Sequence, residues 1–322
     1  MRVGIADNVF AASGAFEALD RILDHFLSGR HLWEIGDVDA IKRSPWLAGG
    51  DRVARRNNEI LEKCFVASAT RPSGDLHAQL LSVDLTGAPP HRLTPADGVT
   101  YLSSPAIVVV ENEESDGAFL DALVHALDRA ELWQALESRW IELDHAGGYG
   151  EIEKRLERYL SRTQGPPRVL VLADSDRLFP GHQTSTLTKI VEVCTRLGVP
   201  HVTLEKRAIE NYLPVGALQR SNRRDCYQAF LKLDMVQRAH YGMKKGFPRD
   251  DAGKVVVSAE QAALFQHVPA KVLDDLGGGF GSDAWEFFKT ARDVITADTL
   301  ALTCLGSPGE LPALLDRIEA LI

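Results

Sequence analysis

Carboxylate side chains follow two apolar segments that have the composition of buried β-strands. Glu111 comes directly after the segment 106–110. Asp174 and Asp176 follow the segment 168–173 in the same way. Because parallel strands end at the same edge of a sheet, we expect these carboxylates to lie close together. Such hard oxygen ligands suit Mg²⁺ or Mn²⁺, and a metal held there could activate water against a phosphate.

Further residues could complete a site for phosphoryl transfer. Asp116 and Glu210 could add oxygen ligands, and Lys244 or Lys245, in a basic turn flanked by aromatic residues, could stabilise charge on a reacting phosphate. The predicted metal ligands are Glu111, Asp174, Asp176, Glu210 and Asp116, and the predicted catalytic residues are Glu111, Lys244 and Lys245.

Each of these residues also has a purely structural interpretation. The acidic segment 111–116 would suit the first turn of a helix, where the helix dipole favours negative charge. Asp174 could be a helix N-cap. Glu210 could pair with neighbouring basic residues at the surface, and the two lysines could lie in an exposed loop. We favour the metal site because acidic residues recur near the ends of several expected strands.

The motifs together resemble the TOPRIM domain, the metal-binding core of topoisomerases, DnaG-type primases and OLD-family nucleases. The matching elements are the strand that ends before Glu111, the glycine-rich segment 145–150 and the strand that ends in Asp174-Ser175-Asp176. The segment 209–214 is similar to the Glu-Asn-Tyr element of OLD-like TOPRIM proteins. The resemblance covers residues 105–215.

Two positions depart from the usual family pattern. Asn112 stands where the family usually has glycine, and Asp116 lies one residue further from Glu111 than the common spacing. Glu113 and Glu114 are therefore alternative ligands in place of Glu111.

The resemblance implies a Mg²⁺- or Mn²⁺-dependent nuclease that cleaves phosphodiester bonds in DNA or RNA, with DNA preferred, and a role in defence against phage. It also implies a separate ATPase partner, since the chain has no GxxxxGK[ST] motif of its own. Two alternatives stay open: a catalytically inactive TOPRIM subunit that regulates or scaffolds a complex, and a metal-dependent transferase that uses the Asp-x-Asp motif.

The composition is that of an ordinary globular protein, with 45% hydrophobic and 25% charged residues among 322. The net charge of −9 argues against nonspecific coating of nucleic acid, so phosphate binding would be local or would need a partner. The four cysteines form no CxxC pair, which makes a zinc site unexpected and suggests reduced thiols. With no apolar run of membrane-spanning length and no secretory leader at the start of the sequence, we expect a cytoplasmic protein.

The hydrophobic periodicity divides the chain into three regions. Residues 1–104 are expected to be mainly helical with one strand over 79–85, residues 105–215 to form the catalytic core, and residues 216–322 to be helical. In the core, alternating strands and helices predict an α/β fold of the TOPRIM type, a mainly parallel sheet with helices on both faces. The helical flanks could bury a face against a partner or a second copy of the chain.

Within these regions the individual elements can be placed. The expected core strands are 106–110, 140–143, 168–173 and 201–204, and the expected core helices are 116–138, 151–163 and 184–197. The expected helices of the flanks are 15–27, 51–65, 215–236, 259–276, 282–295 and 312–322, with a tight loop or hinge at the glycine-rich segment 277–281.

Overall fold

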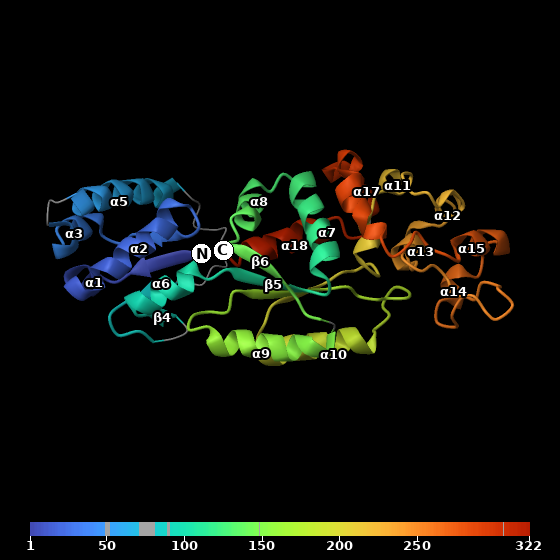
Figure 1. The fold of residues 1–322 in the computed structure, drawn as a ribbon, viewed down its shortest axis with the longest axis horizontal. Helices are drawn as coiled ribbons and strands as arrows, with labels where there is room; N and C mark the ends of the chain where they lie inside the picture. The colour runs from blue at the N-terminus through green and yellow to red at the C-terminus, as the bar shows by residue number, and fades with distance from the viewer. Residues whose placement is uncertain (49–51, 71–80, 89–90, 148, 305) are drawn as a thin grey trace.

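The protein contains two parallel β-sheets and a set of short C-terminal helices, which follow one another along its long axis (Figure 1). The computed structural model describes residues 1–48, 52–70, 81–88, 91–147, 149–304 and 306–322. None of the helices in this part of the chain combines the length and apolar composition needed to cross a membrane.

The N-terminal region is built around a four-stranded parallel sheet, which the sequence did not lead us to expect. The strand order is β2-β1-β3-β4. The strands are β1 Arg2–Ile5, β2 Leu32–Glu34, β3 Leu81–Val83 and β4 Arg92–Leu93. Only β3 was anticipated, within 79–85, of which residues 79 and 80 lie outside the described residues. Strands of two to four residues are too short to show the alternation that identifies a strand in sequence.

Helices surround this first sheet and give it a core of its own. The helices are α1 Asp7–Ala11, α2 Phe16–Leu27, α3 Val38–Lys42, α4 Pro45–Ala48, α5 Arg52–Thr70 and α6 Pro95–Ser103. The helices expected over 15–27 and 51–65 are α2 and α5. In this core the rings of Phe10 and Phe26 pack against Trp33, and Phe10 also contacts the ring of Trp46. The core is separate from those of the second sheet.

The second sheet is also fully parallel, with strand order β6-β5-β7-β8. Its strands are β5 Ala106–Val110, β6 Ile141–His145, β7 Val169–Ala173 and β8 His201–Thr203, so all four expected core strands are confirmed. Every residue of β7 is buried. Such continuous burial explains why the sequence of β7 is apolar throughout rather than alternating.

Helices cover both faces of this central sheet, as expected for the α/β class. They are α7 Glu113–Ala126 and α8 Ala130–Glu137 on one face, and α9 Ile152–Arg162 and α10 Ser185–Leu197 on the other. Val108 and Val110 belong to the first core and Val109 to the second, because successive side chains of a strand point to opposite faces. The single helix expected over 116–138 is two helices, and Asp128 between them has a left-handed φ of 52°.

In the C-terminal region the helix expected over 312–322 is confirmed as α18 Glu310–Glu319, but the other three expected helices are replaced by shorter ones. The helices that precede α18 are α11 Val215–Leu218, α12 Arg224–Phe230, α13 Met235–His240, α14 Ala262–Phe265, α15 Ala270–Leu276, α16 Phe287–Thr290 and α17 Ala297–Thr303. Helix α17 was not anticipated. New helices begin where Asp234 and Thr296 act as N-caps, and Pro269 directly precedes α15. These helices share one core with α7 and α8.

Candidate functional site

Glu111 and Asp174 lie at the same edge of the central sheet. Each is the first residue after its strand, and β5 and β7 are neighbouring parallel strands, with Val109 opposite Val171. The edge expected for the carboxylates is therefore the one that the fold provides. His145, the last residue of β6, contributes Nδ1 at 2.6 Å from the carbonyl oxygen of Glu111 and so helps to fix the end of β5.

Asp116 lies in the first turn of α7, directly beside this edge. Its Oδ2 accepts a hydrogen bond of 2.9 Å from the backbone N–H of Asn112. Burial raises the pKa of Asp116 to about 6, and the negative charges of Glu111 and Glu210 act in the same direction. Asn112 caps the helix by accepting hydrogen bonds from two backbone N–H groups. The departure from glycine at this position thus has a structural cause and does not by itself argue for an inactive site.

Asp174 and Asp176 are presented by a tight turn after β7. The hydroxyl of Ser175 donates to the carbonyl oxygen of Lys206 over 2.6 Å, and Asp176 adopts a left-handed φ of 52°. Asp174 is not a helix N-cap, because the next helix is capped by Thr184. Its Oδ1 accepts one hydrogen bond of 3.1 Å, from the N–H of Ile209.

Both carboxyl groups of this turn are electrostatically unfavourable as anions. Burial raises the pKa of Asp174 well above its ordinary value, and the nearby Asp116 and Glu210 raise it further. Burial and Glu111 likewise raise the pKa of Asp176, although this side chain keeps substantial contact with solvent. The carboxylates therefore lie close enough to repel one another, as a metal-binding cluster would before it binds a cation.

Glu210 is fully buried and provides the deepest carboxylate of the cluster. Its side chain has 0% exposure, and neither carboxylate oxygen has a hydrogen bond of good geometry. The ammonium of Lys244 supplies a counter-charge, with Nζ 3.1 Å from Oε1. Partial burial of Lys244 would lower its pKa, but Glu210, Asp174 and Glu111 outweigh that effect and raise it. A surface ion pair, the structural alternative for Glu210, is excluded by this burial.

Asn211 joins the Glu210 turn to the segment that carries Lys244. The turn is a short 3₁₀ helix, Ile209–Tyr212. The Nδ2 group of Asn211 donates to the carbonyl oxygens of Arg238 and Tyr241 at 2.7 and 3.0 Å. Sequence reasoning left this asparagine without a definite role. The structure indicates that it sets the distance between the buried carboxylate and the lysine.

The glycine-rich segment 277–281 packs against the turn that carries Lys244. The N–H of Gly281 donates to the carbonyl oxygen of Lys244 over 3.1 Å. Gly279 has a φ of +58°, and a Cβ atom there would lie 2.6 Å from the same oxygen. The close approach of two backbones requires glycine at this position. The segment is a tight loop, one of the two roles expected for it.

Two basic residues remain to be placed. Lys245 is exposed and forms no hydrogen bond or ion pair with the part of the chain that the structure describes, so the structure brings Lys244 and not Lys245 to the carboxylates. Arg207, which sequence reasoning treated only as a surface partner for Glu210, instead opposes the rise in the pKa of Asp176 by its positive charge. The one feature of the sequence that could have placed Arg207 near the site is its position next to Lys206, shortly after β8.

The carboxylate oxygens of the cluster are of the chemical type that binds a hard divalent cation, although they are not already arranged around a single metal position. Among the described residues, no three His, Cys, Asp or Glu side chains are arranged to hold a metal ion. The cluster nevertheless offers only carboxylate oxygens, two of which are buried without hydrogen bonds. Mg²⁺ and Mn²⁺ prefer such ligands, and a divalent charge would relieve the repulsion that raises the pKa values. Side-chain movement around Lys244 would be needed to close such a site.

The sequence and the structure were also compared with known proteins. Neither family models, nor curated proteins, nor solved structures give a match to this chain.

Proposed function

We propose that this chain is a metal-dependent nuclease that hydrolyses phosphodiester bonds at the carboxyl edge of its central sheet. The observation that carries this proposal is geometric: Glu111 and Asp174 follow neighbouring strands, and Lys244 lies 3.1 Å from the buried Glu210. This arrangement couples carboxylates from separate segments to one lysine. The coupled residues are Glu111, Asp116, Asp174, Asp176, Glu210 and Lys244. Such mutual repulsion has a stability cost in a metal-free protein, and it is typical of functional sites.

The carboxylates have different accessibility, which suggests a division of roles. Glu210 and Asp116 are buried and would act as fixed ligands at the base of the site. Glu111 and Asp176 are exposed and could face both a metal and a substrate. When bound, Mg²⁺ or Mn²⁺ would lower the pKa of a water molecule and neutralise charge on the scissile phosphate.

Lys244 would stabilise the charge that develops on the phosphate. Its side chain is 41% exposed while its ammonium contacts the buried Glu210, so it lies between the interior and the solvent. A ligand cation that took over the charge of Glu210 would free the lysine to donate to phosphate oxygens. This interpretation agrees with the lysine that the TOPRIM resemblance implies in a C-terminal element.

The substrate and the biological setting form a coarser part of the proposal. Following the resemblance, we propose DNA in preference to RNA as substrate, a role in defence against phage, and a separate ATPase as partner. The acidic net charge of −9 is compatible with a partner that supplies affinity for nucleic acid.

A nuclease assay on the full chain with neighbouring lysine variants tests the activity. Lys244→Ala should slow cleavage of labelled DNA in Mg²⁺ or Mn²⁺ by about a hundredfold, the usual effect of removing a group that stabilises transition-state charge. Lys245→Ala is the matched control, since this exposed lysine lies outside the cluster, and it should cleave at the wild-type rate. Metal-independent cleavage, or equal rates for both variants, would reject the proposed site.

A further inference from the structure

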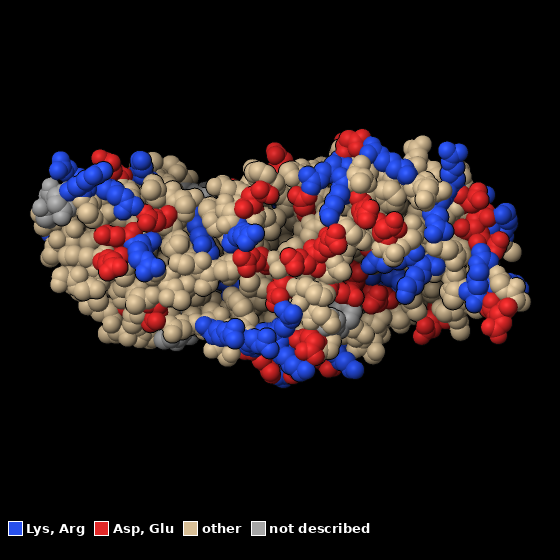
Figure 2. All heavy atoms as spheres, in the orientation of Figure 1, with Lys and Arg blue, Asp and Glu red and all other residues tan. Residues whose placement is uncertain are grey.

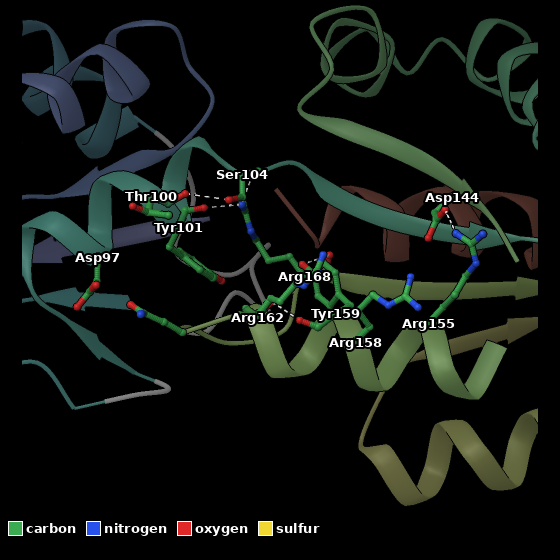
Figure 3. Close-up of a pocket in the computed structure, with 12 residues that line it drawn as sticks. Asp97, Thr100, Tyr101, Ser104, Asp144, Arg155, Arg158, Tyr159, Arg162 and Arg168 are labelled. Atoms are coloured by element: carbon green, nitrogen blue, oxygen red, sulfur yellow. Dashed lines mark hydrogen bonds and ion pairs between the residues drawn. The ribbon is translucent and has the colours of Figure 1, made fainter. Parts of the chain in front are cut away.

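A pocket of about 330 Å³ lies at the junction of the N-terminal region and the central sheet. Figure 3 shows that α6 lines it on one side and α9 on the other. Ser104 and Arg168 line the same pocket, and Arg168 directly precedes β7 while Ser104 lies two residues before β5. This part of the pocket is therefore at the amino end of the central strands, away from Glu111 and Asp174, whereas its Asp144 lies near the carboxyl end of β6.

Arg168 is a buried cation in this pocket, and none of the described carboxylates pairs with it. The residue is 3% exposed, and its Nη2 donates to the carbonyl oxygens of Tyr101, at 2.8 Å, and Ser104. Its guanidinium carbon lies 4.8 Å from the centre of the Tyr101 ring, and its Nη1 has no hydrogen-bond partner in the part of the chain that the structure describes. A buried charge that is not paired with an opposite charge is unfavourable for folding.

Other arginines add to the positive charge at the junction. Arg30 donates to the same carbonyl oxygen of Ser104 over 2.6 Å. Burial and the charge of Arg168 lower its pKa to about 10. These two positive charges, which converge on one carbonyl group, repel each other, and a bound anion would reduce that repulsion.

The exposed side of the pocket carries two further guanidinium groups. Arg158 and Arg162 are one turn apart on α9, about 6 Å along the axis, and neither side chain pairs with any residue that the structure describes. By contrast, Arg155 on the same helix pairs with Asp144. Figure 2 shows Lys and Arg side chains gathered over α9.

The acidic residues that line the pocket are already engaged. Asp144 is the partner of Arg155. Asp97 accepts a hydrogen bond of 2.7 Å from the hydroxyl of Thr94, the N-cap of α6. Neither carboxylate neutralises Arg158, Arg162 or Arg168, so the pocket keeps an excess of positive charge.

We propose that this junction pocket binds the phosphate group of a nucleotide, either free or within a nucleic acid strand. Arg168 would supply a fixed buried charge, and Arg158 and Arg162 would reach the phosphate oxygens from α9. Guanidinium groups favour phosphate because their N–H donors match its oxygens in pairs. The volume is within the range of small-ligand sites, and the hydroxyl groups of Thr100 and Ser104 could bind a sugar. The proposal does not depend on whether the carboxylate edge cleaves phosphodiesters.

Binding measured on the full chain without divalent metal tests this inference separately from catalysis. The probes are adenosine diphosphate, adenosine and a short fluorescent single-stranded oligonucleotide, at low salt. The test variant is Arg158→Ala/Arg162→Ala, in which both changed residues are exposed. The control Lys154→Ala/Lys189→Ala removes the same charge from exposed positions of α9 and α10 outside the pocket.

We expect the arginine variant to bind a phosphate-bearing probe at least about tenfold more weakly, equivalent to roughly 1.4 kcal/mol, while the lysine variant binds as wild type. Adenosine should not bind. Binding of the diphosphate identifies a free nucleotide as the source, and binding of the oligonucleotide alone identifies a strand. Equal weakening in both variants, or no binding of either phosphate probe, would overturn the proposal.

Discussion

The acidic residues at the carboxyl ends of the two parallel sheets differ in their hydrogen bonds and in the direction of their pKa shifts. Asp84 directly follows β3 of the first sheet, as Asp174 directly follows β7 of the second. One oxygen of Asp84 accepts hydrogen bonds from the hydroxyl and N–H of Thr86, both at 2.7 Å, and from the N–H of Gly87 at 2.8 Å. These bonds lower the pKa of Asp84. Asp174 accepts a single bond and has a raised pKa.

The difference separates a structural carboxylate from one that is available for chemistry. The anionic form of Asp84 is stabilised by hydrogen bonds from the loop that follows it, so its charge does not need a bound cation. The anionic form of Asp174 is opposed by its neighbours and would be stabilised by an added cation. Position at a strand end thus does not distinguish the two aspartates, whereas the hydrogen bonds around each carboxylate do.

The largest expected effect comes from replacing each of these two aspartates by alanine in separate variants. Asp174→Ala should reduce metal-dependent cleavage about a thousandfold, roughly 4 kcal/mol in the activation barrier, because a metal ligand is lost. The melting temperature of the metal-free variant should stay equal or rise, since one of several repelling charges is removed.

Asp84→Ala should show the reverse behaviour. It removes the acceptor of three hydrogen bonds and should lower the melting temperature by several degrees, with cleavage unchanged. Cleavage rates and melting curves from the same preparations decide the matter. Wild-type cleavage by the Asp174 variant would show that the two sheets do not differ in function.

An intermediate effect is expected from the glycine loop that supports Lys244. Gly279→Ala combines a left-handed φ of +58° with a Cβ atom 2.6 Å from the carbonyl oxygen of Lys244. The strain, of order 1–3 kcal/mol, should displace the lysine turn and slow cleavage about tenfold. Gly278→Ala is the control, because its nearest contact would be 3.6 Å away, at a side chain. Both variants should be assayed below their melting temperatures, and equal rates would show that the loop does not position the lysine.

The smallest effect is a difference in pH dependence between the two edges. The pKa of Asp116 is raised to about 6 from 3.8, so metal-free wild type should lose stability as pH rises from about 4 through about 6. Replacement by Asn should remove this loss, which amounts to roughly 3 kcal/mol at most. The pKa of Asp84 is lowered, so its contribution is present above 3.8 and is lost as pH falls further.

To test this, the melting temperatures of Asp116→Asn and Asp84→Asn are each compared with that of wild type across this pH range in a metal chelator. The comparison shows whether each carboxylate stabilises the protein more at low or at high pH. The first variant should gain on wild type as pH rises, and the second should gain on it only in acid. The same sign for both would remove the contrast between the sheets.

The sequence allowed the central sheet and its carboxylates to be predicted because long apolar strands leave a clear signal. Strand β7 is buried along its whole length, and Asp174 follows it directly. The first sheet could not be predicted, since β4 has only two residues and β1 pairs with β3, which lies far along the chain. The helices expected over 215–236, 259–276 and 282–295 were wrongly predicted as continuous, because apolar periodicity continues across residues such as Asp234 that begin new helices.

The sequence also could not decide whether Lys244 or Lys245 lies at the carboxylates. The answer depends on the contact of Lys244 with a loop more than thirty residues later in the chain, around Gly279 and Gly281. For the same reason the charge at the domain junction was not foreseen. Arg168 becomes a buried, unpaired cation only when α6 of the N-terminal region packs beside it.

The shared core of the central sheet and the C-terminal helices has a consequence for how the molecule unfolds. Phe119 of α7 contacts both Tyr212 and Phe288, so a fragment ending at residue 215 would expose a large apolar surface. Residues from α7 through α18 should therefore melt in one cooperative transition. The N-terminal sheet has its own core, and its contacts with the rest include those between Tyr101 and the segment of Pro166 and Arg168. It should therefore melt in a second, separate transition seen by calorimetry.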